Sequence, residues 1–257
     1  MQAPEAVAGR VAARTSERVQ RVLDTLAVTD LVYHHLAFTQ PLVDVLVRET
    51  SRQNPRRVIA IGPNELLAAV LIDLGFDVDL WLLDGLPLSD DLRSRASRSG
   101  QLEEVLARPA DILADIVLAP YVVEAWSAEP AATLQLLAAS VAPGGKLIVA
   151  VRSPDELKRR WRRTRGPTPD DMPPSPVWPR LQNMQRLGAA QLVSAGDRAG
   201  LAAIRVLRTT DHRAFLRTEP LSVSRWGSKT VGHVAKRLIP AIRDCTVVTY
   251  ARSNLSM

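Results

Sequence analysis

The stretch VIAIGPNELLAAVLIDLGFDVDLWLLD, from Val58 to Asp84, decides the fold. It opens with a short apolar run that ends at a Gly-Pro pair, which is typical of a buried strand followed by a tight turn. The segment ELLAAVLIDL has the composition of a helix, which Asn64 would cap and Gly75 would end. A second apolar run then reaches an acidic residue. The stretch therefore predicts strand, turn, helix and strand.

Strand and helix patterns keep alternating after this unit. Short apolar runs predict further strands at Ala114–Ala119, Lys146–Val151, Gly200–Thr210 and Cys245–Ala251. Helices are predicted over Ala131–Val141 and in LQNMQRLGAAQLVSAG, and the turn APGG precedes Lys146. The polar region from Pro87 to Arg108 is expected to be helical in its later half, without a clear strand. The segment PYVVEAW is expected to be a loop.

This alternation predicts an α/β fold, because each strand that returns to the same sheet through a helix does so by a right-handed crossover. The expected architecture is a Rossmann-like, doubly wound, mostly parallel sheet with helices on both faces. Ligands bind such sheets beyond the carboxyl ends of the strands. We therefore expect the turns after Ile61, Leu83 and Ala119 to lie together at one site.

The chain is expected to have two parts. Residues 1–54 form an N-terminal helical segment, with a helix from Ser16 and another from Pro41, and residues 55–257 form the α/β domain. Within that domain, 157–181 combines a basic helix with GPTPDDMPPSPVWPRL, which holds six prolines. By its position, this proline-rich stretch is expected to be a lid over a substrate, with Trp178 in contact with it.

Composition narrows the class of protein. The 257 residues are 46% hydrophobic, enough to bury a full core. The single cysteine, Cys245, excludes a disulfide within the chain and a cysteine-based zinc site, and no metal site is expected. No apolar run reaches the roughly 18 to 20 residues of a membrane-spanning helix. With no pattern of a signal peptide, we expect a cytoplasmic protein.

The excess positive charge is concentrated in one place. The run KRRWRRTR, Lys158–Arg165, holds six of the 33 basic residues, and the other 27 balance the 27 acidic residues. A protein that lies along a nucleic acid normally spreads its basic excess over a face, so this pattern argues against that class. The run instead suggests a clamp for a phosphorylated or nucleotide-linked substrate, formed by Arg159, Arg160, Arg162 and Arg163. Contact with RNA through arginine and aromatic side chains is one alternative, and a solvated helix face is the other.

Three segments carry a family resemblance. LQLLAASVAPGGKLIVAV, ADIVLAPYVVEAW and LIPAIRDCTVVTYARS resemble, in this order, segments of the class I S-adenosylmethionine-dependent methyltransferases, and the resemblance covers roughly Arg56 to Arg252. It implies a seven-stranded sheet with an antiparallel C-terminal hairpin, and S-adenosylmethionine as the cofactor. Another doubly wound fold, such as that of a dehydrogenase, is the alternative.

The cofactor turn departs from the family pattern, acid-x-Gly-x-Gly-x-Gly. That pattern falls on Ala60, Gly62, Asn64 and Leu66, so only the first glycine is present. Glycines serve such a turn by adopting positive φ and by letting the backbone approach the cofactor. Asn64 tolerates a left-handed conformation better than most residues and is expected to hold the turn. The alternative is that Asn64 only caps the helix.

Two further positions match the family's cofactor site. Asp84 ends the second strand, where the family uses an acid to accept hydrogen bonds from the ribose hydroxyls. Pro120 and Tyr121 follow the fourth strand of the family pattern, beside the cofactor, although packing is the alternative for the tyrosine. In amino-methylating enzymes a polar residue precedes this pair, and here those positions are Leu118 and Ala119. We therefore do not assign the motif of those enzymes to this segment.

Methyl transfer to a hydroxyl needs a base and an aligned acceptor. His34 and His35 lie ahead of the first strand, where family members often place a segment that closes over the cofactor. Glu124, in the loop after Tyr121, is the other candidate. For each histidine, a surface or inter-helix contact is the alternative.

Two functions follow from these observations. One is methyl transfer from S-adenosylmethionine to a small-molecule or glycan-type acceptor. The other is a methyltransferase-like protein that has lost catalysis and works as a partner subunit or scaffold, possible also as an oligomer. The retained Gly62 and Asp84 favour the first, and the missing acid and glycines favour the second.

Overall fold

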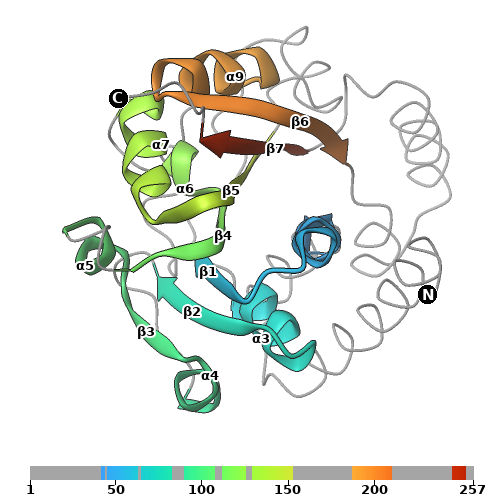
Figure 1. The fold of residues 1–257 in the computed structure, drawn as a ribbon, viewed down its shortest axis with the longest axis vertical. Coiled ribbons are helices and arrows are strands. Elements are labelled where there is room, and N and C mark those ends of the chain that lie inside the picture. Colours follow the sequence, from blue (N-terminus) through green and yellow to red (C-terminus); the bar gives the residue numbers. More distant parts are fainter. Residues whose placement is uncertain are drawn as a thin grey trace, which may run out of the picture.

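The computed structural model describes residues 42–43, 45–62, 65–82, 90–107, 112–125, 129–152, 187–209 and 245–252. Its centre is one seven-stranded sheet with the order β3-β2-β1-β4-β5-β7-β6 (Figure 1). The strands are β1 (Arg57–Ile61), β2 (Asp77–Leu82), β3 (Arg98–Gln101), β4 (Ala114–Pro120), β5 (Val141–Arg152), β6 (Leu201–Thr209) and β7 (Cys245–Arg252).

Helices connect these strands. Those that follow β1 are α3 (Glu65–Asp73), α4 (Asp90–Arg95), α5 (Leu102–Ala107), α6 (Val122–Ala125), α7 (Pro130–Ala139) and α9 (Ala189–Arg198). Residues 42–43 and 45–53, ahead of β1, are also helical. Within the described ranges, no helix is long and apolar enough to cross a membrane.

The sheet is parallel from β3 through β5, and β7 runs antiparallel to both β5 and β6. This confirms the predicted α/β class, the seven strands and the antiparallel C-terminal hairpin. Strands β1 and β4 are almost wholly buried, as their continuous apolar sequences predicted, because helices cover both faces of a parallel sheet.

Two apolar clusters form the core, one on each face of the sheet. On one face, α3 packs together with Leu42, Val43, Leu46 and Val47 against side chains such as Val58, Leu80 and Ile148. Leu134 and Leu137 of α7 and Leu192 of α9 pack on the other face, against side chains such as Ile59. Figure 1 shows this division, with α7 and α9 on the side opposite α3.

Several expectations need correction. The region 87–108 contains a strand, β3, which the sequence did not reveal because RSGQ is polar and lies at the sheet edge. Gly100 allows this strand to pair with β2, since a β-carbon there would lie 2.6 Å from Cζ3 of Trp81. The expected loop after β4 begins with the short helix α6. The expected turn APGG is part of β5, where the pairing with β4 is irregular.

Other expectations fall outside the described residues. They concern the helix from Ser16 and the basic helix and proline-rich stretch at 157–181.

Candidate functional site

The carboxyl ends of β1 and β4 meet at Gly62 and Pro120. Gly62 has a φ of +109°, and its N–H donates a hydrogen bond to the carbonyl oxygen of Trp81 in β2 at 2.9 Å. A β-carbon on Gly62 would lie 2.9 Å from the carbonyl oxygen of Pro120 and 3.2 Å from Cγ2 of Val122. The turn after β1 thus touches both neighbouring strands, as expected for the ligand-binding edge of a doubly wound sheet.

Tyr121 occupies an unusual position directly after β4. Its φ is +63°, in the left-handed region that residues other than glycine seldom adopt. Its N–H donates to the carbonyl oxygen of Ala150 at 2.7 Å, which ties the end of β4 to β5. The side chain is buried, with its hydroxyl 3.9 Å from Sγ of Cys245. These contacts give Tyr121 a packing role, and a contact with the cofactor stays a prediction.

Glu124 lies on α6, one turn beyond the end of β4, and is 2% exposed. A carboxylate buried at this edge has the position expected of a group that meets an acceptor. Its role as a base stays a prediction.

The structure therefore gathers four of the predicted site residues, Gly62, Pro120, Tyr121 and Glu124, around the carboxyl ends of β1 and β4. The other predicted site residues lie outside the described ranges: His34, His35, Asn64, Asp84, Arg159, Arg160, Arg162, Arg163 and Trp178. In the sequence, Asp84 comes two positions after Leu82, the last residue of β2.

A different acidic residue of β2, Asp79, contacts Arg57 at the amino end of β1. Its Oδ2 accepts hydrogen bonds from Nη2 and Nε of Arg57 at 2.5 and 3.1 Å. Burial raises the pKa of Asp79 above its ordinary value, and the bond from Arg57 opposes that effect without cancelling it. Because Arg57 begins β1, this carboxylate is directed toward the amino ends of the strands, away from the ligand-binding edge.

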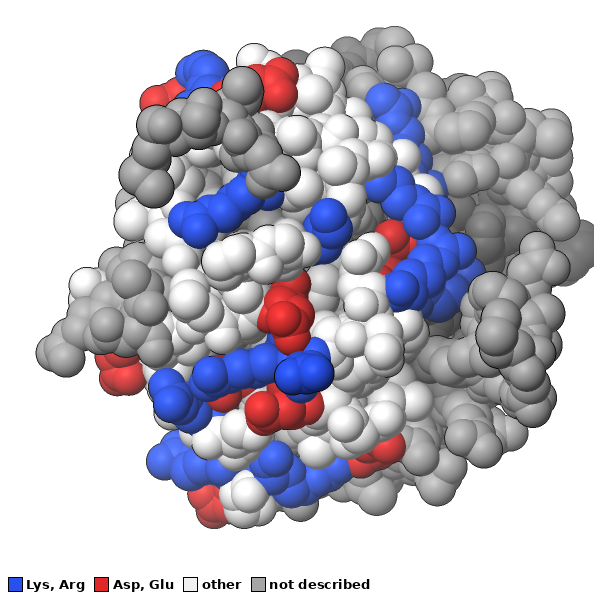
Figure 2. Space-filling view, in the orientation of Figure 1, with Lys and Arg blue, Asp and Glu red and all other residues white. Residues whose placement is uncertain are grey.

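Charge is mixed on the face of the molecule that Figure 2 draws. Figure 2 shows basic side chains in several separate patches, with acidic side chains between them. This distribution is unlike the continuous basic face of proteins that lie along nucleic acid. Among the described residues, no group of three or more His, Cys, Asp or Glu side chains could hold a metal ion.

The sequence matches no protein-family model and no curated protein. The fold, in contrast, has many counterparts among solved structures. An S-adenosylmethionine-dependent methyltransferase from Archaeoglobus fulgidus is 12% identical, with a TM-score of 0.52 over 82% of this chain and 93% of its own. The chain has the class I methyltransferase fold.

Two further counterparts share this fold. A putative methyltransferase of Haloferax volcanii, solved in complex with a methyltransferase activator, is 16% identical, with a TM-score of 0.51 over 77% of this chain and 83% of its own. A glycopeptide N-methyltransferase complexed with sinefungin is 12% identical, with a TM-score of 0.50 over 82% of this chain and 94% of its own. At such low identity the likeness concerns the methyltransferase fold, and activity has to be argued from the site.

Proposed function

We propose that this protein transfers a methyl group from S-adenosylmethionine to a small-molecule or glycan-type acceptor. The observation that carries the proposal is Gly62. It holds a positive φ at the carboxyl end of β1, next to the end of β4, as the turn at a cofactor edge requires.

The residues of this edge fit the cofactor in complementary ways. Gly62 would let the cofactor approach the backbone at the end of β1, because it has no side chain. Asn64 stands at the next glycine position of the family pattern. Asp84 accepts hydrogen bonds from the ribose hydroxyls, which a carboxylate does better than a neutral side chain. When bound, the cofactor supplies a methyl group on a positively charged sulfur.

The acceptor side of the site needs a group that takes a proton. We assign this role to Glu124 on α6, with His34 or His35 from the N-terminal segment as the alternative. Arg159, Arg160, Arg162 and Arg163 bind anionic parts of the acceptor, and Trp178 covers it. With one cysteine, the chain also suits the reducing cytoplasm.

One observation favours the second function, a non-catalytic partner subunit. The carbonyl oxygen of Pro120 lies where a side chain on Gly62 would begin, so the fold itself requires this glycine. Retention of Gly62 is therefore explained without a cofactor. Ile204 and Val206 on β6 are 52% and 43% exposed, as side chains in a protein interface are before assembly.

A variant with the glycines of the family pattern restored distinguishes between the two proposed functions. We expect Asn64→Gly with Leu66→Gly to tighten binding of S-adenosylhomocysteine at least severalfold, because the turn regains close backbone approach. The matched control is Gly75→Ala, a glycine change at the far end of α3. If neither the natural protein nor the double variant binds the ligand while both are folded, the methyltransferase proposal fails and the partner function stands.

A further inference from the structure

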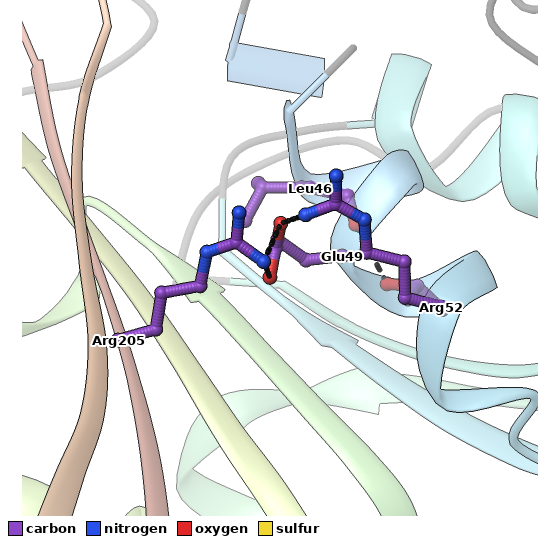
Figure 3. Close-up of polar contacts among 5 residues, drawn as sticks. Leu46, Glu49, Arg52 and Arg205 are labelled. Carbon is purple, nitrogen blue, oxygen red and sulfur yellow. Dashed lines mark hydrogen bonds and ion pairs between the residues drawn. The ribbon is translucent and has the colours of Figure 1, made fainter. Parts of the chain in front are cut away.

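A second polar cluster lies away from the ligand-binding edge, between the helical segment 45–53 and β6. Oε1 of Glu49 accepts a hydrogen bond from Nη1 of Arg52 at 2.7 Å. Nη1 of Arg205, on β6, lies 3.2 Å from Oε1 and 3.3 Å from Oε2 of the same carboxylate. Figure 3 shows Glu49 between the two guanidinium groups. Two arginines from separate elements thus share one acid.

The three side chains differ in exposure. The side chain of Glu49 is 3% exposed, whereas those of Arg52 and Arg205 are 47% and 41% exposed. Within the described residues, each guanidinium uses only its Nη1 on Glu49, and an arginine has five N–H donors. Each guanidinium has a second terminal nitrogen that points away from Glu49. In the view of Figure 3, both of these nitrogens point toward the top.

This arrangement is a positioned pair of cations. The acid neutralises one of the two charges, so the cluster keeps a net charge of about +1. The shared carboxylate also fixes both arginine side chains before an anion binds. An anion therefore loses less binding free energy to the ordering of these side chains. Arginine N–H groups form their strongest hydrogen bonds with phosphate and carboxylate oxygens.

We infer that Arg52 and Arg205, held by Glu49, bind a phosphate group. A phosphate has enough oxygens to accept hydrogen bonds from both guanidiniums while Glu49 remains in place. Arg205 pairs with Thr249 of β7, which pairs with Ile148 in the middle of β5, and β6 continues from there to Thr209. The phosphate site is therefore separate from the ligand-binding edge, and it needs no cofactor.

Titration of the cofactor-free protein with inorganic phosphate tests this, with ionic strength held constant by chloride. The natural protein should bind saturably, and Arg52→Gln or Arg205→Gln should weaken binding roughly tenfold, the loss expected for one charge-assisted hydrogen bond. Arg198→Gln is the matched control, because Arg198 forms an exposed pair with Glu129 and should leave binding unchanged. The inference would be overturned by a lack of saturable binding, or by a glutamine variant that binds phosphate as tightly as the natural protein does.

If a glutamine variant does not fold, the lysine variant at the same position is titrated with phosphate in its place. Lysine keeps a charge beside Glu49 but lacks the planar fork, so binding should weaken at least roughly threefold. Unchanged affinity in Arg205→Lys would overturn the inference as well. Because no cofactor is present, the result is independent of the methyltransferase proposal.

A second arm identifies the source of the phosphate, by comparing glucose 6-phosphate with inorganic phosphate. Tighter binding of the ester supports a phosphate carried by a larger molecule, and weaker binding supports the free ion. Binding of unphosphorylated glucose with equal affinity would contradict a phosphate site.

Discussion

Gly62 faces the carbonyl oxygen of Pro120 so closely that a β-carbon on the glycine would lie 2.9 Å from it. This contact joins the ends of two neighbouring strands, β1 and β4, at the edge where doubly wound sheets bind ligands. It means that the fold needs one glycine of the cofactor turn, whatever the turn binds. Asn64 and Leu66, in contrast, stand where the family pattern that the sequence resembles has its other two glycines.

Gly62→Ala should destabilise the protein more than Gly75→Ala. Both glycines have positive φ, +109° and +89°, which costs an alanine about 1–2 kcal/mol. Nothing lies within 4 Å of a β-carbon at Gly75, whereas overpacking against Pro120 adds about 1–3 kcal/mol at Gly62. Urea unfolding of both variants measures the difference, and equal losses would show that the Gly62–Pro120 contact relaxes freely.

Asp84→Asn should weaken binding of S-adenosylhomocysteine roughly tenfold, because an amide accepts weaker hydrogen bonds from hydroxyl groups than a carboxylate does. Asp77→Asn is the matched control, since Asp77 is exposed at the other end of β2 and bonds to Ser97 Oγ. Equilibrium dialysis with labelled ligand measures both. Unchanged affinity in Asp84→Asn would remove that residue from the site.

Asp79 should make stability depend on pH. Because burial raises its pKa above 3.8, the folded protein keeps a proton that the unfolded chain has already lost. The stability that Asp79 contributes is therefore full below the unfolded pKa and declines as pH rises through the folded pKa. Unfolding of the natural protein and of Asp79→Asn from about pH 4 to 7 measures this. An advantage of the natural protein that grows with pH would show that the ion pair with Arg57 dominates.

Gly196→Ala should destabilise the protein although it adds alanine to a helix. Alanine is favoured over glycine inside a helix by about 1 kcal/mol. At Gly196 of α9, however, a β-carbon would overlap Cε1 of Tyr250 and lie 3.0 Å from Cδ1, at an overpacking cost of about 1–3 kcal/mol. The ring is fixed because its hydroxyl donates to the carbonyl oxygen of Leu192 at 2.8 Å.

The same change in a Tyr250→Leu background provides the control. With the ring gone, helix propensity should prevail, and Gly196→Ala should become neutral or stabilising in thermal unfolding. Destabilisation of equal size in both backgrounds would mean that the ring is not the cause.

The fold was predictable where local sequence and global structure agree. Apolar β-branched runs gave β1 and β4, and Gly75 ends α3 with a φ of +89°, as its position predicted. Strand β3 was missed because its four polar residues carry no apolar pattern, and its place depends on the ring of Trp81.

The cluster around Glu49 and part of the ligand-binding edge depend on contacts between distant residues. Arg205 lies 156 positions after Glu49, and nothing in either segment indicates that they meet. The left-handed φ of Tyr121 was equally hidden, because tyrosine does not favour that conformation and the residue is held by tertiary contacts such as its bond to Ala150. The presence of Glu124 at the edge, in contrast, followed from the order of strand and loop.

The most direct test of the methyltransferase proposal is isothermal titration of the purified, cofactor-free protein with S-adenosylmethionine and S-adenosylhomocysteine. We predict saturable binding of both, with dissociation constants on the order of micromolar, because the turn at Gly62 keeps the conformation that a cofactor edge needs. Absence of heat at high ligand concentration, from protein shown to be folded, would contradict the proposal and leave the partner function.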